Sequence, residues 1–251
     1  MKPHRAFPIL TIRDGEAVKT RSFRDVIYVG DPVNTVRIWS ELCVDEIVCL
    51  DISAERSSII ARAEEVAAIV EEAFVPLGYG GGIDSLDSAA IFFDQGIEKV
   101  VIGWDGAVTA PLLDALASRY GQQAVCCCVD YSFHADMILK LNQASKTVVS
   151  AGSLVEIVST LSSAGVGEIL LQCVDRDGMR TGFDLVSALR CREVASVPLV
   201  LVGGARSIVD VESAWELGCS AASSTLFNLW NQSDQVLVGN PLFQQIEPYP
   251  K

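Results

Sequence analysis

The chain has 251 residues, half of them hydrophobic, and 32 acidic against 19 basic side chains give it a net charge of −13. That length suits one α/β barrel or two small domains, and the charge disfavours nucleic acid or an anionic membrane as a partner. No apolar run approaches the roughly 18 residues needed to span a membrane, and the N-terminus leads directly into a strand-like segment rather than a signal peptide. We therefore expect a soluble, cytoplasmic protein.

Eight cysteines occur, three of them consecutively at Cys126, Cys127 and Cys128 inside an apolar run. None forms a CxxC pair, and neither His4 nor His134 has a cysteine at metal-ligand spacing. The pattern favours buried, reduced thiols, which fit the cytoplasm, with zinc or a disulfide as the alternatives. We expect no metal and no cofactor.

The first half of the chain begins with a strand, Arg5–Ile12, and a long polar stretch, Glu16–Asp31. A connection of that length indicates a mobile functional loop. Pro32 then begins a helix with Asp31 as its cap. The other elements predicted in this half are a strand at Ile47–Ile52, a helix at Ile59–Ala73, a glycine-rich turn at Gly78–Ile83, a helix from Leu86 and a strand at Lys99–Ile102.

The second half repeats this alternation without a break in composition, which predicts one domain with a parallel sheet. Its strands are predicted at Ala124–Val129, in the apolar part of Glu168–Gly178 that ends at the two carboxylates, at Pro198–Val202 and around Ala221–Ser224. Its helices are predicted at Leu154–Ala164 and Val209–Leu217.

A repeat relates the two halves, because Asp51 precedes Gly81-Gly82 by about as much as Asp175 precedes Gly203-Gly204. Half-barrels of roughly residues 1–122 and 123–240, with a C-terminal tail at 241–251, would close into a single (β/α)8 TIM barrel of residues 1–251. A doubly wound sheet is the alternative, but it would need an early Gly-x-Gly-x-x-Gly turn that the sequence lacks.

Glycines after barrel strands let backbone N–H groups approach a phosphate, and plain turns are the alternative explanation. Gly82, Gly204 and the Asp177-Gly178 pair lie at such places and suggest a ligand with a phosphate at each end. Lys19 in the first loop would add a cation to this otherwise acidic protein.

Asp51 and Asp130 end strands at the carboxyl edge, where barrel enzymes do their chemistry and where a carboxylate can act as a general acid or base. A capping or structural aspartate is the alternative. Thr11 occupies the place that corresponds to Asp130 in the other half, and a threonine cannot transfer protons near neutral pH.

The opposite, amino-terminal mouth collects a second set of charges, since Arg5, Glu46, Lys99 and Glu168 all begin predicted strands. Two acids and two bases could form a charge-balanced ring there, or they could be ordinary surface ion pairs.

These residues give the chain a resemblance, along nearly its whole length, to the cyclase subunit of imidazole glycerol phosphate synthase. The matching stretches are Asp14-Gly15, Val18-Lys19, Gly30-Asp31-Pro32, Asp45-Glu46, Leu50-Asp51-Ile52, Gly80-Gly81-Gly82-Ile83, Gln123-Ala124-Val125, Gly167–Leu171, Asp175–Gly178 and Gly203-Gly204-Ala205.

The resemblance implies a (β/α) barrel in a heterodimer with a glutaminase. Ammonia would enter at the amino-terminal mouth and react at the other end with a substrate that carries two phosphates. It also implies that Arg5, Glu46, Lys99 and Glu168 gate the ammonia entrance, and that Glu98 contacts the glutaminase.

This chain departs from the family pattern at the carboxyl-terminal end of the expected barrel, where the ammonia would react. Thr11 stands where the family has its first catalytic aspartate, although Asp130, the second, is present. Gly103-Trp104 replaces an Asn-Thr pair at one phosphate site, and the segment Tyr131–Gly152 also differs in character. The other phosphate site is better preserved, with Asp177, Gly178, Gly204, Ser224 and Thr225.

Preserved ammonia handling with an altered cyclase centre resembles a branch linked to glycosyl amidation in surface polysaccharide (lipopolysaccharide) synthesis. The stretches similar to that branch are Val18-Lys19-Thr20, Phe23, Tyr28-Val29-Gly30-Asp31-Pro32 and Val44-Asp45-Glu46. This resemblance implies ammonia delivery to a third, amidotransferase protein that acts on a phosphorylated or nucleotide sugar. The alternatives are a genuine cyclase (a lyase) of histidine biosynthesis and a non-catalytic, ammonia-conducting scaffold.

Overall fold

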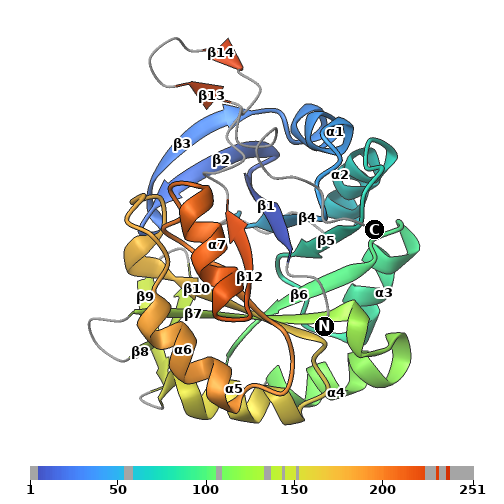
Figure 1. Ribbon diagram of the computed structural model, residues 1–251. Coiled ribbons are helices and arrows are strands. Elements are labelled where there is room, and N and C mark those ends of the chain that lie inside the picture. The colour runs from blue at the N-terminus through green and yellow to red at the C-terminus, as the bar shows by residue number, and fades with distance from the viewer. Residues whose placement is uncertain are drawn as a thin grey trace.

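The computed structural model describes residues 5–53, 59–105, 109–132, 137–142, 145–150, 153–223, 230–231 and 236–237. Eight parallel strands pair in the order β10-β11-β12-β1-β4-β5-β6-β7, and pairing of β10 with β7 closes the ring into a barrel (Figure 1). These strands are β1 (Ala6–Arg13), β4 (Ile47–Asp51), β5 (Leu77–Gly80), β6 (Lys99–Gly103), β7 (Val125–Ser132), β10 (Glu168–Cys173), β11 (Leu199–Val202) and β12 (Ser220–Ser223).

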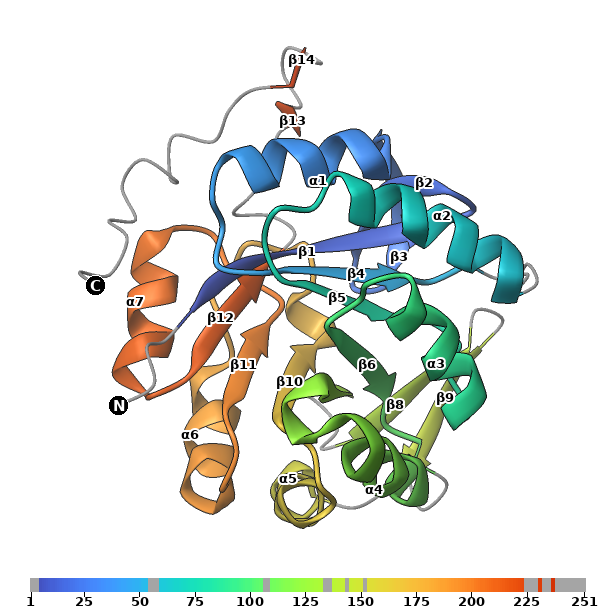
Figure 2. The same ribbon diagram turned by 90° about the vertical axis from the view of Figure 1, so that its right-hand side faces the viewer.

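Helices cover the outside of the barrel, as Figures 1 and 2 show. They are α1 (Pro32–Glu41), α2 (Ile59–Glu71), α3 (Leu86–Asp94), α4 (Thr109–Tyr120), α5 (Leu154–Ser163), α6 (Leu185–Val194) and α7 (Ile208–Glu216). Their starts follow local chemistry, since the Asp31 carboxylate accepts a hydrogen bond from Asn34 N and Ser153 forms a capping box with Glu156. Within the described residues, no helix has the length and apolar character needed to cross a bilayer.

Side chains alternate between the inside and the outside of the barrel with the two-residue period of a strand. On β1, Phe7 and Ile9 belong to a small buried cluster, whereas Ala6 and Leu10 belong to the larger cluster under the helices. The small cluster lies inside the barrel and comprises Phe7, Ile9, Val48, Val101, Cys126, Cys128, Leu170, Val200, Val202 and Ala222. The barrel interior is therefore a packed apolar core.

The polar stretch Glu16–Asp31 is an ordered hairpin, which corrects the expectation of a mobile loop. β2 (Glu16–Arg21) pairs antiparallel with the end of β1, and β3 (Arg24–Gly30) pairs with β2. In the second half, β8 (Met137–Asn142) and β9 (Ser145–Ser150) extend β7 in the same way. The strands that carry Thr11 and Asp130 thus both continue into hairpins, an arrangement that supports the predicted half-barrel repeat.

The glycine-rich stretch Gly78–Ile83 begins as a barrel strand, so the prediction of a turn over all of it is wrong. Gly78 and Gly80 of β5 face the barrel interior, where a Cβ on Gly80 would lie 2.8 Å from the Val101 carbonyl oxygen. Glycine is required there by close packing, while Tyr79 between them is buried on the outer side. The turn itself starts at Gly81, whose φ is 143°.

The other predicted strands and helices are present, with ends that differ by at most a few residues. The helices α4 and α6 were not predicted. The division into half-barrels near residue 122 stays a prediction, and the tail 241–251 lies outside the described residues. A short antiparallel pair, β13 (Trp230–Asn231) and β14 (Val236–Leu237), follows the barrel.

Substitution of Gly80 by alanine should destabilise the fold by about 1–3 kcal/mol, because the added methyl group would overlap Val101 and Leu50 in the packed interior. Gly103→Ala is the matched control, since a Cβ there meets nothing within 4 Å. Urea unfolding of both variants measures the difference, and equal midpoints would contradict this account of β5.

Candidate functional site: a charged ring and the opposite mouth of the barrel

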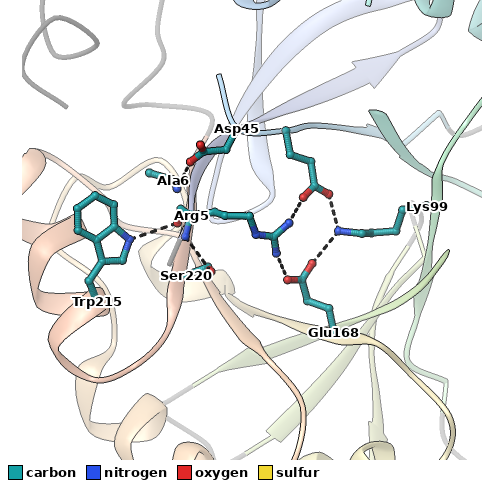
Figure 3. Close-up of polar contacts among 8 residues, drawn as sticks. Arg5, Ala6, Asp45, Lys99, Glu168, Trp215 and Ser220 are labelled. Carbon is teal, nitrogen blue, oxygen red and sulfur yellow. Dashed lines mark hydrogen bonds and ion pairs between the residues drawn. The ribbon is translucent and has the colours of Figure 1, made fainter. Parts of the chain in front are cut away.

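Four charged side chains close a ring at the amino-terminal mouth of the barrel (Figure 3). Arg5 forms ion pairs with Glu46 and Glu168, and Lys99 Nζ lies 2.5 Å from Glu46 Oε1 and 2.9 Å from Glu168 Oε2. Each carboxylate therefore contacts both cations, and the ring balances two positive with two negative charges. The structure brings together all four residues that the sequence placed at strand starts.

The backbone around Arg5 is fixed by groups from three other elements (Figure 3). Arg5 N donates to Ser220 Oγ, Trp215 Nε1 donates to the Arg5 carbonyl, and Ala6 N donates to an Asp45 carboxylate oxygen. The first strand thus enters the barrel with its arginine already aimed at the two glutamates.

Burial gives the charged ring its electrostatic character. The side chains of Glu46 and Glu168 are 4% and 6% exposed, and that of Lys99 is 14% exposed. Burial raises the pKa of Glu46 despite the opposing charges of Lys99 and Arg5. Burial alone would lower the pKa of Lys99, but Glu168 and Glu46 together raise it. A buried ring of this kind persists only with every charge paired, because an unpaired charge would lack both water and a partner.

The carboxyl-terminal mouth holds Thr11 and Asp130, which share the inward-facing row of residues with the ring. On β1 the row runs Arg5, Phe7, Ile9, Thr11, a span of roughly 20 Å along the strand. Asp130 accepts a contact from Cys128 Sγ at 3.6 Å. Burial raises the pKa of Asp130 to about 7, with the charge of Asp177 adding to the shift and the Cys128 contact opposing it. The mouth thus offers one carboxyl group poised to exchange a proton near neutral pH.

The hairpin formed by β2 and β3 is held over this mouth by Asp177 and Gly178. Thr20 Oγ1 donates to Asp177 Oδ2 at 2.6 Å, and Ser22 N donates to the Asp177 carbonyl. A Cβ on Gly178 would lie 2.3 Å from the Thr20 carbonyl oxygen. In this structure these two residues bind the hairpin, and their predicted role toward a phosphate stays a prediction.

Lys19 belongs to β2 of the same hairpin, and its Nζ is buried without a hydrogen-bond partner. Burial lowers the pKa of Lys19 to about 7, with Arg180 lowering it further and Asp177 opposing the shift. A buried amine without a hydrogen-bond partner is a group that an anionic ligand could contact. That role too stays a prediction.

The predicted phosphate-binding glycines follow β5 and β11 at this mouth. Gly82 and Gly204 have φ values of 62° and 102°, and Gly204 accepts a backbone hydrogen bond from Gly182. Asp51 is engaged locally, because one of its oxygens accepts from both Ser53 N and Ser53 Oγ. Ser224 and Thr225 lie outside the described residues.

Two residues near this mouth were not found from the sequence. Arg62 on α2 is 5% exposed and donates to the Gly81 carbonyl, so it supports the glycine turn from behind. Cys128 contacts Asp130 through the inward alternation of β7. The alternation of β7 could have revealed Cys128, whereas nothing in the helical pattern of α2 marks Arg62.

Two of the residues that depart from the family pattern, Gly103 and Trp104, lie at the end of β6. Gly103 is exposed, and the indole of Trp104 is buried with its Nε1 unpartnered. Glu98 is exposed at the opposite, amino-terminal mouth. Over the part of the chain that the structure describes, no group of three or more His, Cys, Asp or Glu side chains could hold a metal ion.

Comparison with known proteins shows which family the chain resembles. A family model described as "Histidine biosynthesis protein" matches residues 5–225. A relative from Pseudomonas aeruginosa, named "Putative imidazole glycerol phosphate synthase subunit hisF2", is 34% identical, with 96% of this chain and 97% of the relative covered. The "Imidazole glycerol phosphate synthase subunit HisF" of Streptococcus sanguinis is 33% identical over 86% of each chain.

A third relative, the "Putative imidazole glycerol phosphate synthase subunit hisF3" of Vibrio vulnificus, is 32% identical over 94% of this chain and 92% of its own length. The closed ring of eight parallel strands covered by helices defines the fold class as a (β/α)8 barrel. The chain belongs to the histidine biosynthesis protein family and is HisF-like.

Lys99→Met should destabilise the protein by about 3–5 kcal/mol, because it leaves two buried glutamates with Arg5 as their single cation. Arg13→Met is the control, since Arg13 pairs with Asp14 at the surface and its loss should cost about 0–1 kcal/mol. Urea unfolding at pH 7 compares them, and equal losses would show that the ring behaves as a surface pair.

Asp130 should titrate with a midpoint near pH 7 rather than near 4. Because its pKa is raised, the carboxyl group is protonated below that pH, so any step using it as a base should gain rate as the pH rises through about 7. Carboxyl ¹³C NMR of aspartate-labelled protein measures the midpoint, and the signal is assigned by its loss in Asp130→Asn. A midpoint near 4 would contradict the expected environment.

Proposed function

We propose that this barrel receives ammonia from a glutaminase partner at the charged ring and delivers it through the barrel interior to the opposite mouth. There the ammonia serves amidation of a sugar for surface polysaccharide synthesis, carried out with a third, amidotransferase protein. The observation that carries this proposal is the pairing of a complete buried ring at one mouth with Thr11 in place of a second carboxylate at the other.

The charged ring supports the part of the proposal that concerns ammonia. The ring's two cations and two carboxylates offer hydrogen-bond donors and acceptors to a small polar molecule that arrives at the strand starts. Beyond the ring lies the small apolar cluster of the barrel interior, which includes the thiols of Cys126 and Cys128 and suits neutral ammonia better than ammonium. The word "subunit" in the relatives' names supports a partner.

The residues at the carboxyl-terminal mouth support the part of the proposal that concerns the substrate that receives the ammonia. Cyclisation with two proton-transferring carboxylates would require an acid at position 11, and Thr11 cannot supply it. Gly103 and Trp104 change the shape of the mouth at β6, where the family resemblance leads us to expect small polar donors. A mouth altered in this way favours a substrate other than the family's two-phosphate compound.

A labelling experiment tests the proposal. Barrel, glutaminase and amidotransferase from the source organism are supplied with [¹⁵N-amide]glutamine, excess unlabelled ammonium and an N-acetylated nucleotide sugar. Delivery through the barrel predicts ¹⁵N-rich product with wild-type protein and label diluted toward the buffer value with Lys99→Met. Val186→Ala, on the outer face of α6, is the control that should keep the label. Equal dilution in all three would contradict delivery through the ring.

A working histidine-pathway cyclase is the second candidate, and Asp130 with its pKa near 7 is the observation in its favour. Loss of one general acid or base typically costs about 10²–10⁴-fold in rate. Thr11→Asp should therefore raise any weak formation of imidazole glycerol phosphate by at least about tenfold. Product formation by the wild type at the rate of the Streptococcus sanguinis relative, assayed side by side, would overturn the amidation proposal and favour this candidate.

A further inference from the structure

The three consecutive cysteines of β7 face different sides of the barrel wall. Cys126 and Cys128 belong to the interior cluster, whereas Cys127 between them belongs to the larger cluster under the helices. The same alternation brings Asp130 to the inner side at the carboxyl end of the strand. Cys128 therefore directly precedes Asp130 among the inward-facing residues of β7, and its Sγ lies 3.6 Å from Asp130 Oδ1.

The surroundings of the sulfur decide which atom is the donor in this contact. Cys128 is buried, and burial raises the pKa of its thiol well above the usual value, with the charge of Asp130 raising it further. The thiol therefore keeps its proton, so the S–H group donates and the carboxylate oxygen accepts. A thiol is a weak donor, but a hydrogen bond is stronger in a buried place than in water.

The two neighbouring strands do not provide an equivalent contact for Asp130. β6 ends at Gly103, which pairs with Cys128 and has no side chain. On the other side of β7, the register partner of Asp130 is Gln172 of β10, a buried residue. The Gln172 side chain hydrogen-bonds Asp177, whose negative charge acts against ionisation of Asp130. The hydrogen bond that orients the Asp130 carboxylate thus comes from its own strand.

We infer that Cys128 is a positioning residue for Asp130, because its thiol holds Oδ1 and thereby presents Oδ2 to the molecule that reacts at the carboxyl-terminal mouth. This inference rests on the proposed function, in which ammonia arrives at that mouth. Oδ2 takes a proton from the ammonia nitrogen as that nitrogen bonds to its acceptor, and Asp130 then returns the proton to solvent. The sulfur forms no bond and keeps its own proton throughout.

Packing alone does not call for sulfur at position 128. The neighbouring strands fill the interior cluster with hydrocarbon side chains such as Val101 and Leu170, and a hydrocarbon at 128 would pack there too. It would offer no donor to Asp130. A thiol differs in that it stabilises the ionised carboxylate, against the effect of burial.

The charged groups at this mouth set the direction of the expected pH effects. Burial and the charge of Asp177 raise the pKa of Asp130, and the contact with Cys128 lowers it. Lys19 of β2 acts through Asp177, since its positive charge lowers the pKa of that carboxyl group. Loss of the thiol donor should therefore leave Asp130 protonated up to a higher pH.

Carboxyl ¹³C NMR of the full, aspartate-labelled barrel tests the contact independently of activity. Cys128→Ala removes the donor and should raise the midpoint of Asp130 by about 0.5–1 pH unit, the size of one weak hydrogen bond to a charged group. Cys128→Ser supplies a stronger donor and should place the midpoint at or below the wild-type value. Cys127→Ala, which removes the adjacent sulfur on the outer side of β7, should change it by less than about 0.3 unit.

The pH dependence of amidation tests the positioning role. The barrel, glutaminase and amidotransferase are assayed with glutamine and an N-acetylated nucleotide sugar. Cys128→Ala should lower the rate at pH 7 by about three- to tenfold and move the acidic limb of the profile upward with the Asp130 midpoint. Cys128→Ser should restore both, and Cys127→Ala should match the wild type. A cysteine that only fills space would leave the acidic limb in place.

Each outcome decides a separate point. An Asp130 midpoint that Cys128→Ala leaves unchanged, or that Cys127→Ala moves equally, overturns the inference. A raised midpoint in Cys128→Ser overturns it as well, so the test does not depend on folding of the alanine variant. A shifted midpoint with wild-type rate and acidic limb overturns the positioning role and leaves the proposed function standing. Failure of the wild-type barrel to support amidation overturns the proposed function and the inference with it.

Discussion

The pleat of the barrel strands is the constraint on which the rest of the molecule depends. Because side chains alternate across a strand, a residue chosen at the start of β1 fixes which residues face inward along its whole length. Arg5 faces inward, and so do Phe7, Ile9 and Thr11 after it. Pairing of β7 with β10 closes the barrel and sets the inward-facing residues of all eight strands side by side. The charged ring and the opposite mouth therefore lie at the two ends of the same set of inward-facing residues. A shift of any strand by one residue would point its inward-facing side chains toward the helices instead.

The attraction between the charges of the ring gives little net stability, but loss of any one charge would leave a buried partner unpaired. Removal of two glutamates and two cations from water is costly, and a ring of apolar side chains of similar size would serve stability at least as well. Stability alone therefore does not account for a charged ring at the amino-terminal mouth of a packed barrel, and the proposed passage of ammonia would. The fixed backbone of Arg5, held by Ser220, Trp215 and Asp45, keeps the geometry that such a role requires.

Much of this architecture was predictable from the sequence, because barrel strands that are buried on both faces leave continuous apolar runs with charged ends. The strands that begin at Lys99 and Glu168 were readable for that reason. β5 was not, since its inward positions are glycines and its pattern imitates a turn. The strands of the β2–β3 hairpin were not predicted for a different reason. A polar strand that pairs at the rim of the barrel shows little alternation of hydrophobic and polar residues. Contacts made across the fold, such as the hydrogen bond from Arg62 to the Gly81 carbonyl, have no local signature at all.

The positions of the cysteines allow opening of the barrel to be followed by the reactivity of their thiols. All eight cysteines are free, but Cys43 alone is exposed, and the other seven are buried with their pKa values raised by burial. A thiolate-selective reagent should modify one site in the closed molecule and reach the others only as their strands and helices separate. Cys126 and Cys128 line the interior, whereas Cys191 and Cys219 lie in the helical layer or beside it. The order in which these thiols react would distinguish opening of the barrel interior from loosening of the surrounding helical layer.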